Sequence, residues 1–284
     1  AYIFIGVNLD TTPCACYNGV NFSFTGGSSM KVSQIIFSPT GGTEKVADAI
    51  TSTWGLPVNK IALSNAETDY SSLSFEKDDI ALIAAPSFGG RVPGLATQRI
   101  SNIHGSHTPC VIVCVYGNRA YEDTLVELSD AAEKSGFQVI AAIAAIAEHS
   151  IMHQYAAGRP DTKDKKELSG FAKKISEKIN SNLTSLSTPQ IPGNRSYKKA
   201  AGSGLVPKAD NNCTDCGLCA RQCPAQAISK ENPKVTDSKK CISCMRCVVQ
   251  CPQSSRKVNG AMVSVAALAM KKACSTRKGN ELYI

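Results

Sequence analysis

The sequence predicts an α/β protein in which a doubly wound, five-stranded parallel sheet is followed by a small α+β domain rich in cysteine. Strand and helix patterns alternate between residues 30 and 183, which is typical of βαβ units and a parallel sheet. Eight of the 13 cysteines fall between Cys213 and Cys251. The length of 284 residues is enough for two ordinary domains.

Each strand of the predicted sheet is a short apolar run, and the later runs are apolar almost throughout, as strands covered on both faces are. The strands are expected at residues 31–38, 57–63, 78–86, 109–117 and 137–146. The helices are expected at residues 43–54, 120–136 and 161–180. The first and last helices carry an apolar stripe at helical spacing, and the middle one should stop at Gly136.

Composition and pattern divide the chain into segments. We predict a sheet domain at 30–183, a linker at 184–204, a cysteine-rich domain at 205–257, and a C-terminal helix and tail at 258–284. The linker is rich in Ser, Pro, Gly and Lys and shows no periodicity. Residues 1–29 hold one charge and resemble neither a signal nor a transit peptide. We expect them to be an extension of uncertain origin, with Cys14 and Cys16 as weak ligand candidates.

The cysteines form a repeated motif. The spacing Cys-x2-Cys-x2-Cys-x3-Cys-Pro occurs at residues 213–224 and again at 241–252. Three closely spaced thiolates can hold three corners of one 4Fe-4S cluster, and the fourth cysteine of each run ligates the other cluster. The expected ligands are Cys213, Cys216, Cys219 and Cys251 for one cluster and Cys241, Cys244, Cys247 and Cys223 for the other.

Structural zinc is the alternative, because zinc ribbons pair two Cys-x2-Cys knuckles about 15–20 residues apart. Here each half supplies four cysteines within eleven residues, which favours iron–sulfur clusters. A disulfide scaffold is disfavoured, since its cysteines would be spread along a short secreted chain. Cys110 and Cys114 lie inside a predicted buried strand, and we expect both of them and Cys274 to be structural.

A glycine-rich loop joins the first predicted strand to the first helix. In a doubly wound sheet this position lies at the switch point, where helix N–H groups bind anions. The loop lacks the Gly-Lys-Ser/Thr ending of a triphosphate site and the G-x-G-x-x-G of a dinucleotide site. An ordinary capped turn is the alternative. The candidate phosphate-binding residues are Ser38, Thr40, Gly41, Gly42 and Thr43.

Two further loops should meet the first at the same sheet edge. Each offers glycines, an aromatic residue and an arginine, so a flat ring could be clamped between them. Ordinary loop packing is the alternative for each aromatic residue. The candidates are Pro86, Ser87, Phe88, Gly89 and Gly90 after the third strand, and Tyr116, Gly117, Asn118, Arg119 and Tyr121 after the fourth.

On these motifs residues 30–183 resemble a flavodoxin and residues 205–257 resemble a bacterial two-cluster ferredoxin. The combination is similar to the flavodoxin–ferredoxin fusion proteins of anaerobes. The resemblance implies a flavodoxin-like fold, FMN held by the three loops, and two 4Fe-4S clusters. It also departs from the family: flavodoxins are acidic around the flavin, whereas Arg91 and Arg119 stand in these ring loops.

The formal net charge of +8 admits nucleic-acid binding as one interpretation. Bound cofactors explain it better, because two oxidised clusters and an FMN phosphate would each add about −2. No apolar run reaches the roughly 18–20 residues that span a bilayer. We therefore expect a soluble, cytoplasmic protein that binds no nucleic acid and does not span a membrane. His149 and His153 are expected to lie in a loop rather than to form a metal site.

Three hypotheses about function follow. The first is an electron carrier between FMN, two clusters and redox partner proteins. The second is a flavin-dependent reductase with its own small substrate, although no nicotinamide fingerprint is visible. The third is a ferredoxin with a flavin-free docking domain. No residue is predicted to be catalytic.

Overall fold

The computed structural model describes residues 30–181, 186–200, 202 and 204–284, and residues 1–29, with Cys14 and Cys16, lie outside the described residues. Its main sheet consists of β1 Val32–Ile36, β2 Val58–Ala62, β4 Ile80–Pro86, β6 Thr108–Tyr116, β7 Phe137–Ile146 and β10 Glu281–Tyr283. The helices around the sheet are α1 Gly42–Thr51, α2 Gly94–Ile100, α3 Thr124–Lys134 and α4 Thr162–Ser181. A short pair, β3 Ser74–Phe75 and β5 His104–Gly105, lies beside it.

The five predicted strands form a parallel sheet, which confirms the expected fold class. The strand order is β10-β7-β6-β4-β1-β2, so the five parallel strands follow the flavodoxin-like order 2-1-3-4-5. β1 pairs with both β2 and β4, and the chain crosses over between these neighbours. The switch point therefore lies at the carboxyl ends of β1 and β4, where the candidate phosphate loop begins.

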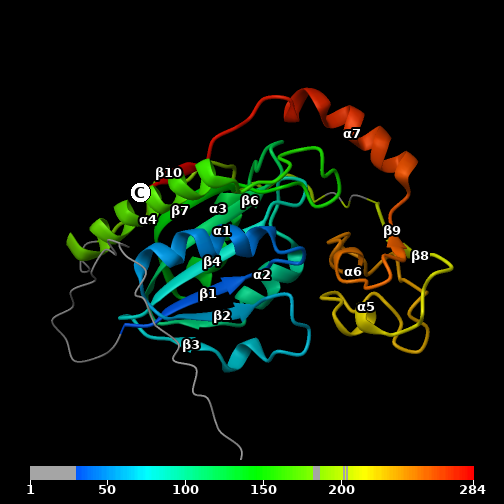
Figure 1. Cartoon of the computed structure of the whole chain (residues 1–284). Coiled ribbons are helices and arrows are strands. Elements are labelled where there is room, and N and C mark those ends of the chain that lie inside the picture. Colours follow the sequence, from blue (N-terminus) through cyan, green and yellow to red (C-terminus); the bar gives the residue numbers. More distant parts are fainter. Residues whose placement is uncertain (1–29, 182–185, 201, 203) are drawn as a thin grey trace, which may run out of the picture.

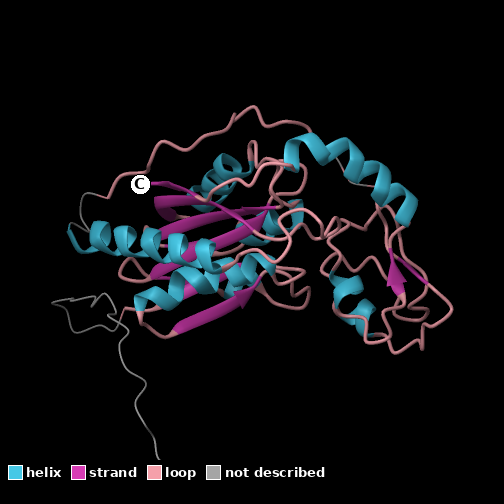
Figure 2. Cartoon of the chain, turned by 45° about the horizontal axis from the view of Figure 1, so that its top comes forward, coloured by secondary structure: helices cyan, strands magenta, loops and turns pink. Residues whose placement is uncertain are grey.

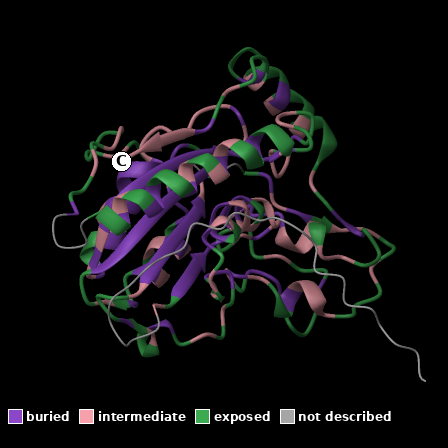
Figure 3. Ribbon diagram, turned by 60° about the vertical axis from the view of Figure 1, so that its left-hand side comes forward, coloured by how far each residue is buried: buried purple, intermediate pink, exposed green. Residues whose placement is uncertain are grey.

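The sheet is covered on both faces, as its apolar strands require (Figures 1 and 2). One buried cluster joins the sheet to α1 and α4 and includes Trp54. The other joins it to α2 and α3. Figure 3 shows the strands buried between exposed helix surfaces. The predicted stripe of α4 is buried at Leu168, Ala172, Ile175 and Ile179.

The segment that we predicted as a linker runs along α3. Its described residues contain neither helix nor strand. Ile191 packs against the cluster on the α2/α3 face. Asp123, which precedes α3, accepts hydrogen bonds from the backbone N–H of Asn194 at 2.9 Å and of Lys198 at 2.8 Å. We call residues 186–199 the strap.

The cysteine-rich domain holds α5 Leu218–Arg221, α6 Arg246–Val249 and the antiparallel pair β8 Lys208–Ala209 and β9 Arg256–Lys257. Helix α7, Gly260–Cys274, leaves it, and the following tail returns to the sheet (Figure 1). The apolar residues Met262, Val265 and Leu268 of α7 point outward, at 50%, 69% and 71% exposure. None of the described helices is long and apolar enough to cross a membrane.

The tail adds a strand that the sequence analysis missed. β10 pairs antiparallel with β7 and places Leu282 beside Ile143. Asn280 donates to Glu167 at 2.6 Å and accepts from the backbone N–H of Ile146 at 3.0 Å. The cysteine-rich domain is therefore anchored at both of its ends, by the strap and by the tail.

Candidate functional site: two thiol-lined hollows and a flavodoxin-like loop edge

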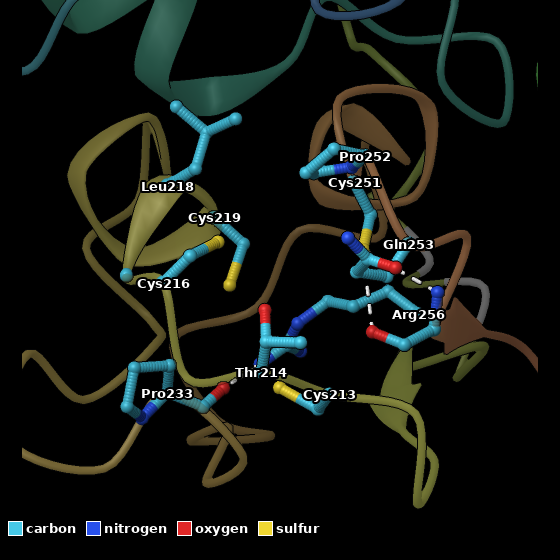
Figure 4. Close-up of a pocket in the computed structure, with 12 residues that line it drawn as sticks. Cys213, Thr214, Cys216, Leu218, Cys219, Pro233, Cys251, Pro252, Gln253 and Arg256 are labelled. Atoms are coloured by element: carbon cyan, nitrogen blue, oxygen red, sulfur yellow. Dashed lines mark hydrogen bonds between the residues drawn. The ribbon is translucent and has the colours of Figure 1, made fainter.

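The first hollow is lined by the thiols of both cysteine runs. Three come from the first run and the fourth, Cys251, comes from the end of the second. Figure 4 shows Cys251 entering on the side opposite Cys216 and Cys219. The first-hollow thiols are those of Cys213, Cys216, Cys219 and Cys251.

The second hollow repeats this arrangement with the roles of the runs exchanged. Its fourth thiol, Cys223, lies two residues after α5 ends. Its other lining residues include Pro224, Ile242 and Met245. The second-hollow thiols are those of Cys223, Cys241, Cys244 and Cys247. Each hollow thus brings together the four cysteines that the spacing predicts for one cluster.

The two hollows differ in burial and in electrostatics. Burial raises the pKa of Cys244 to about 11 and that of Cys247 to about 12, so the metal-free thiols there are protonated near neutral pH. At Cys251 burial acts in the same direction, but hydrogen bonds from the backbone N–H and hydroxyl of Ser255 outweigh it and leave the pKa below its ordinary value. Cluster binding at the second hollow must release these protons.

The thiols of each hollow fit a cluster. Over the described ranges no group of three or more His, Cys, Asp or Glu side chains lies close enough together to hold a single metal ion. Four thiols that line a hollow are the donor set that a 4Fe-4S cluster takes. The residues present therefore fit two clusters, one in each hollow.

The candidate phosphate loop opens directly into α1. Gly41 has φ 87°, a left-handed conformation that favours glycine, and a Cβ there would meet nothing within 4 Å. The hydroxyl of Ser38 accepts from the backbone N–H of Glu44 at 3.0 Å. In the described structure the N–H groups of Gly42 and Thr43 have no protein acceptor. These are the unpaired donors that an anion binds at a helix start.

The two candidate ring loops are joined to each other. The backbone N–H of Asp123 donates to Gly90 at 3.1 Å, and the hydroxyls of Ser87 and Thr124 lie 2.7 Å apart. Both arginines that depart from the flavodoxin pattern are paired with carboxylates. Arg91 bonds Glu127 at 2.7 Å and Arg119 bonds Glu122 at 2.9 Å. The positive charge noted in these loops is therefore largely neutralised on site.

The aromatic residues of the second ring loop have other partners. Tyr116 is 4% exposed and belongs to the core on the α2/α3 face. Tyr121 packs edge-on against it at 5.2 Å and shares hydrogen bonds with Glu281 and Tyr283 of β10 at 2.7 and 2.9 Å. The added strand β10 therefore engages the hydroxyl of Tyr121, one of the residues expected to clamp a flat ring. Phe88, the aromatic candidate of the first ring loop, is half-buried.

Asn118 is hydrogen-bonded to the C-terminal tail. It has φ 67° and is 4% exposed. Its amide donates to the carbonyls of Cys274 and Thr276, both at 2.9 Å, and accepts from the backbone N–H of Lys278 at 3.1 Å. The ring loop is thus fastened to the segment that leaves the cysteine-rich domain, a contact with no local sequence signal.

His149, which was expected to lie in a loop rather than at a metal site, lies against this ring loop. A Cβ at Gly117 would come within 2.6 Å of His149 Cδ2. His149 Nδ1 accepts from the backbone N–H of Ile151 and of Met152, each at 3.1 Å, so its proton resides on Nε2. Burial is the main reason that the pKa of His149 is below its ordinary value. His153, four residues further along the chain, is exposed, and its Nδ1 lies 2.7 Å from a carboxylate oxygen of Glu148.

Comparison with known protein families identifies the cysteine-rich domain. Residues 212–255 match the family model of the 4Fe-4S dicluster domain. No curated protein matches the chain. The family match and the flavodoxin-like strand order together fit a flavodoxin–ferredoxin fusion.

Solved structures resemble the sheet domain. A Streptococcus pneumoniae TIGR4 flavodoxin is 20% identical, with 52% of this chain and 99% of that chain covered and a TM-score of 0.38. A Megasphaera elsdenii flavodoxin is 18% identical, with 50% and 98% covered and a TM-score of 0.33. The fold assignment rests on the strand order and not on these similarities.

Proposed function

We propose that this protein transfers electrons between FMN, bound at the carboxyl edge of the sheet, two 4Fe-4S clusters, and redox partner proteins in the cytoplasm. The observation that carries the proposal is the pair of hollows, each lined by three cysteines of one run and the fourth of the other. They lie in the same chain as a flavodoxin-like sheet. A redox role for both parts follows from these two features.

The residues proposed for FMN are those around the open helix start. The N–H groups of Gly42 and Thr43 would hold the phosphate, with Thr40 as a further donor. The ring would lie between Phe88 and Gly117, which the loops at 86–90 and 116–119 bring to the same edge. His149, whose Nε2 carries a proton, offers that region a neutral hydrogen-bond donor.

The cofactors supply complementary electron chemistry: a flavin exchanges one or two electrons, and each cluster exchanges one. The chain's residues position them. Anchoring the cysteine-rich domain at both ends keeps it close to the loop edge and raises its effective concentration there.

Light-driven reduction of the flavin tests the proposal. Anaerobic protein is illuminated with a sacrificial amine donor while the flavin absorbance and the electron paramagnetic resonance of reduced clusters are recorded. We expect cluster signals to appear as flavin is photoreduced, and not in protein from which the flavin has been removed. Photoreduced flavin beside clusters that stay oxidised would contradict electron transfer within the chain.

Replacing Gly117 with alanine should weaken FMN binding about tenfold, because overpacking a filled site costs on the order of 1–3 kcal/mol. The new methyl group would lie 2.6 Å from His149 Cδ2 and 2.8 Å from its Cβ. Titration of flavin-free protein with FMN, followed by quenching of flavin fluorescence, measures the change. Gly94→Ala is the control, since a Cβ there meets nothing within 4 Å. Equal affinity in Gly117→Ala and wild type would remove the 116–119 loop from the FMN site.

A further inference from the structure

Arg99 joins the two domains. It lies in the last turn of α2, and its Nη1 donates to the carbonyl of Leu63 at 2.6 Å. Its Nη2 donates to the carbonyl of Pro224 at 2.7 Å. The guanidinium also lies 5.7 Å from the centre of the Tyr70 ring. One planar side chain therefore bridges the carboxyl end of β2 and the residue that follows Cys223.

The contact involves the second hollow. Pro224 and Ile242 both line that hollow. Ile242, which lies between Cys241 and Cys244 in sequence, packs against the apolar cluster on the α2/α3 face. The second hollow is thus turned toward the sheet domain. Leu63 follows the end of β2, so the contact lies at the same carboxyl edge as the loops after β1, β4 and β6.

The first hollow differs from the second in its contacts and its exposure. Within the described residues, no hydrogen bond joins a residue that lines it to the sheet domain. Cys216 is exposed, as are Thr214, Pro252 and Gln253 of the same lining. Its thiols therefore lie near solvent, where another protein can approach them.

The strap and the tail connect the cysteine-rich domain to the sheet domain through residues that line neither hollow. The strap binds Asp123, and the tail binds Asn118 and β7. Among the described residues of the sheet domain, Arg99 is the one whose side chain donates a hydrogen bond to a residue of the second hollow. A guanidinium is suited to this task because its rigid fork can reach two carbonyls at once.

We propose that Arg99 is a positioning residue that docks the cysteine-rich domain with its second hollow toward the flavin loops, and that the first hollow is the docking face for an external one-electron redox protein. This rests on the proposed function. With the cofactors bound, electrons would cross between the domains at the second hollow one at a time, so that the donor there would lose one electron as the acceptor gains one. They would enter or leave the chain at the first hollow.

Small-angle X-ray scattering and amide hydrogen exchange of the anaerobic holoprotein test the docking directly. In Arg99→Ala the ratio of docked to open molecules should fall about tenfold or more, since two charge-assisted hydrogen bonds are lost. The radius of gyration should rise, and protection around Leu63 and Pro224 should decrease. Arg99→Lys should restore docking only in part. Gln98→Ala, an exposed neighbour on α2, should leave both measurements unchanged. Unchanged scattering and exchange in Arg99→Ala would overturn the docking role.

Substitutions of the candidate cluster ligands test which hollow exchanges electrons with the flavin and which with the external protein. Cys244→Ser should abolish the appearance of cluster signals after flavin photoreduction, although the first-hollow cluster remains. Cys216→Ser should instead remove the signal of the first-hollow cluster and slow the reduction of an external one-electron acceptor protein. The reverse pattern would overturn the assignment. Iron, sulfide and FMN are measured first in the wild type and in each variant. Wild-type protein that lacks these cofactors would contradict the proposed function, whereas the docking role of Arg99 is judged from scattering and exchange.

Discussion

Replacing Asp164 with asparagine should lower the free energy of unfolding of the sheet domain by about 3–5 kcal/mol, the cost of leaving a buried charge unpaired. The side chains of Asp164 and Arg159 are 1% and 4% exposed. Arg159 donates to Asp164 from Nε at 2.8 Å and from Nη2 at 2.5 Å. Asparagine keeps the shape of the side chain but leaves the guanidinium without its counter-charge.

The same substitution should loosen the C-terminal tail. Asp164 also accepts from Arg277 at 3.1 Å and from Asn280 at 3.3 Å, and both residues belong to the tail. Denaturant unfolding followed by Trp54 fluorescence measures the loss, because this lone tryptophan is buried and bonds the carbonyl of Ala172 in α4. Glu177→Gln, on the exposed side of α4, is the control. A loss below about 1 kcal/mol would show that the pair is not needed for stability.

The stability difference should depend on pH. Burial opposes ionisation of Asp164, but hydrogen bonds from Arg159 and from the backbone N–H of Asp161 outweigh it and hold its pKa below the ordinary value. A carboxyl with a lowered folded pKa stabilises the fold above its unfolded pKa of about 4, and this stabilisation is lost as pH falls through the folded pKa. The difference between wild type and Asp164→Asn should therefore be full at pH 7 and shrink below about pH 4.

Replacing Cys223 with serine should remove the cluster of the second hollow and leave that of the first. Cys223 belongs to the first run but lines the hollow of Cys241, Cys244 and Cys247. Iron content should fall from about eight to about four per chain. Cys274→Ala, a buried cysteine outside both hollows, is the control and should keep all of the iron.

Double variants identify which cluster is lost. Adding Cys244→Ser to Cys223→Ser should remove no further iron, since both side chains serve one hollow. Adding Cys219→Ser to Cys223→Ser should remove the remainder, since Cys219 lines the other hollow. The opposite pairing of effects would mean that each run holds its own cluster with its own fourth cysteine.

Local sequence patterns predicted the features that depend on local chemistry. The strands β4, β6 and β7 are nearly continuous apolar runs, and the structure buries them on both faces. The fixed spacing of the cysteines predicted which thiols share a hollow, because ligand geometry constrains spacing directly. The loop after β1 was predicted as an anion site because it runs straight from a strand into a helix.

Other features depend on contacts between distant residues. β10 is three residues long, and it becomes a strand because it pairs with β7, which lies more than a hundred residues earlier. Arg99 and Asn118 bond to backbone carbonyls, and such partners leave no complementary side chain in the sequence. Tyr121 carries the features of a flavin clamp, but β10 supplies its hydroxyl with partners. Composition alone predicted a linker at 184–204, where the structure shows a strap bonded to α3.

The central claim is that one chain carries a flavin and two iron–sulfur clusters, and cofactor content tests it most directly. Protein purified without oxygen is assayed for iron, acid-labile sulfide, zinc and released flavin per chain. The account predicts about eight iron, about eight sulfide and about one FMN. Zinc in place of iron, or iron without flavin in protein never exposed to chelators or denaturant, would contradict it.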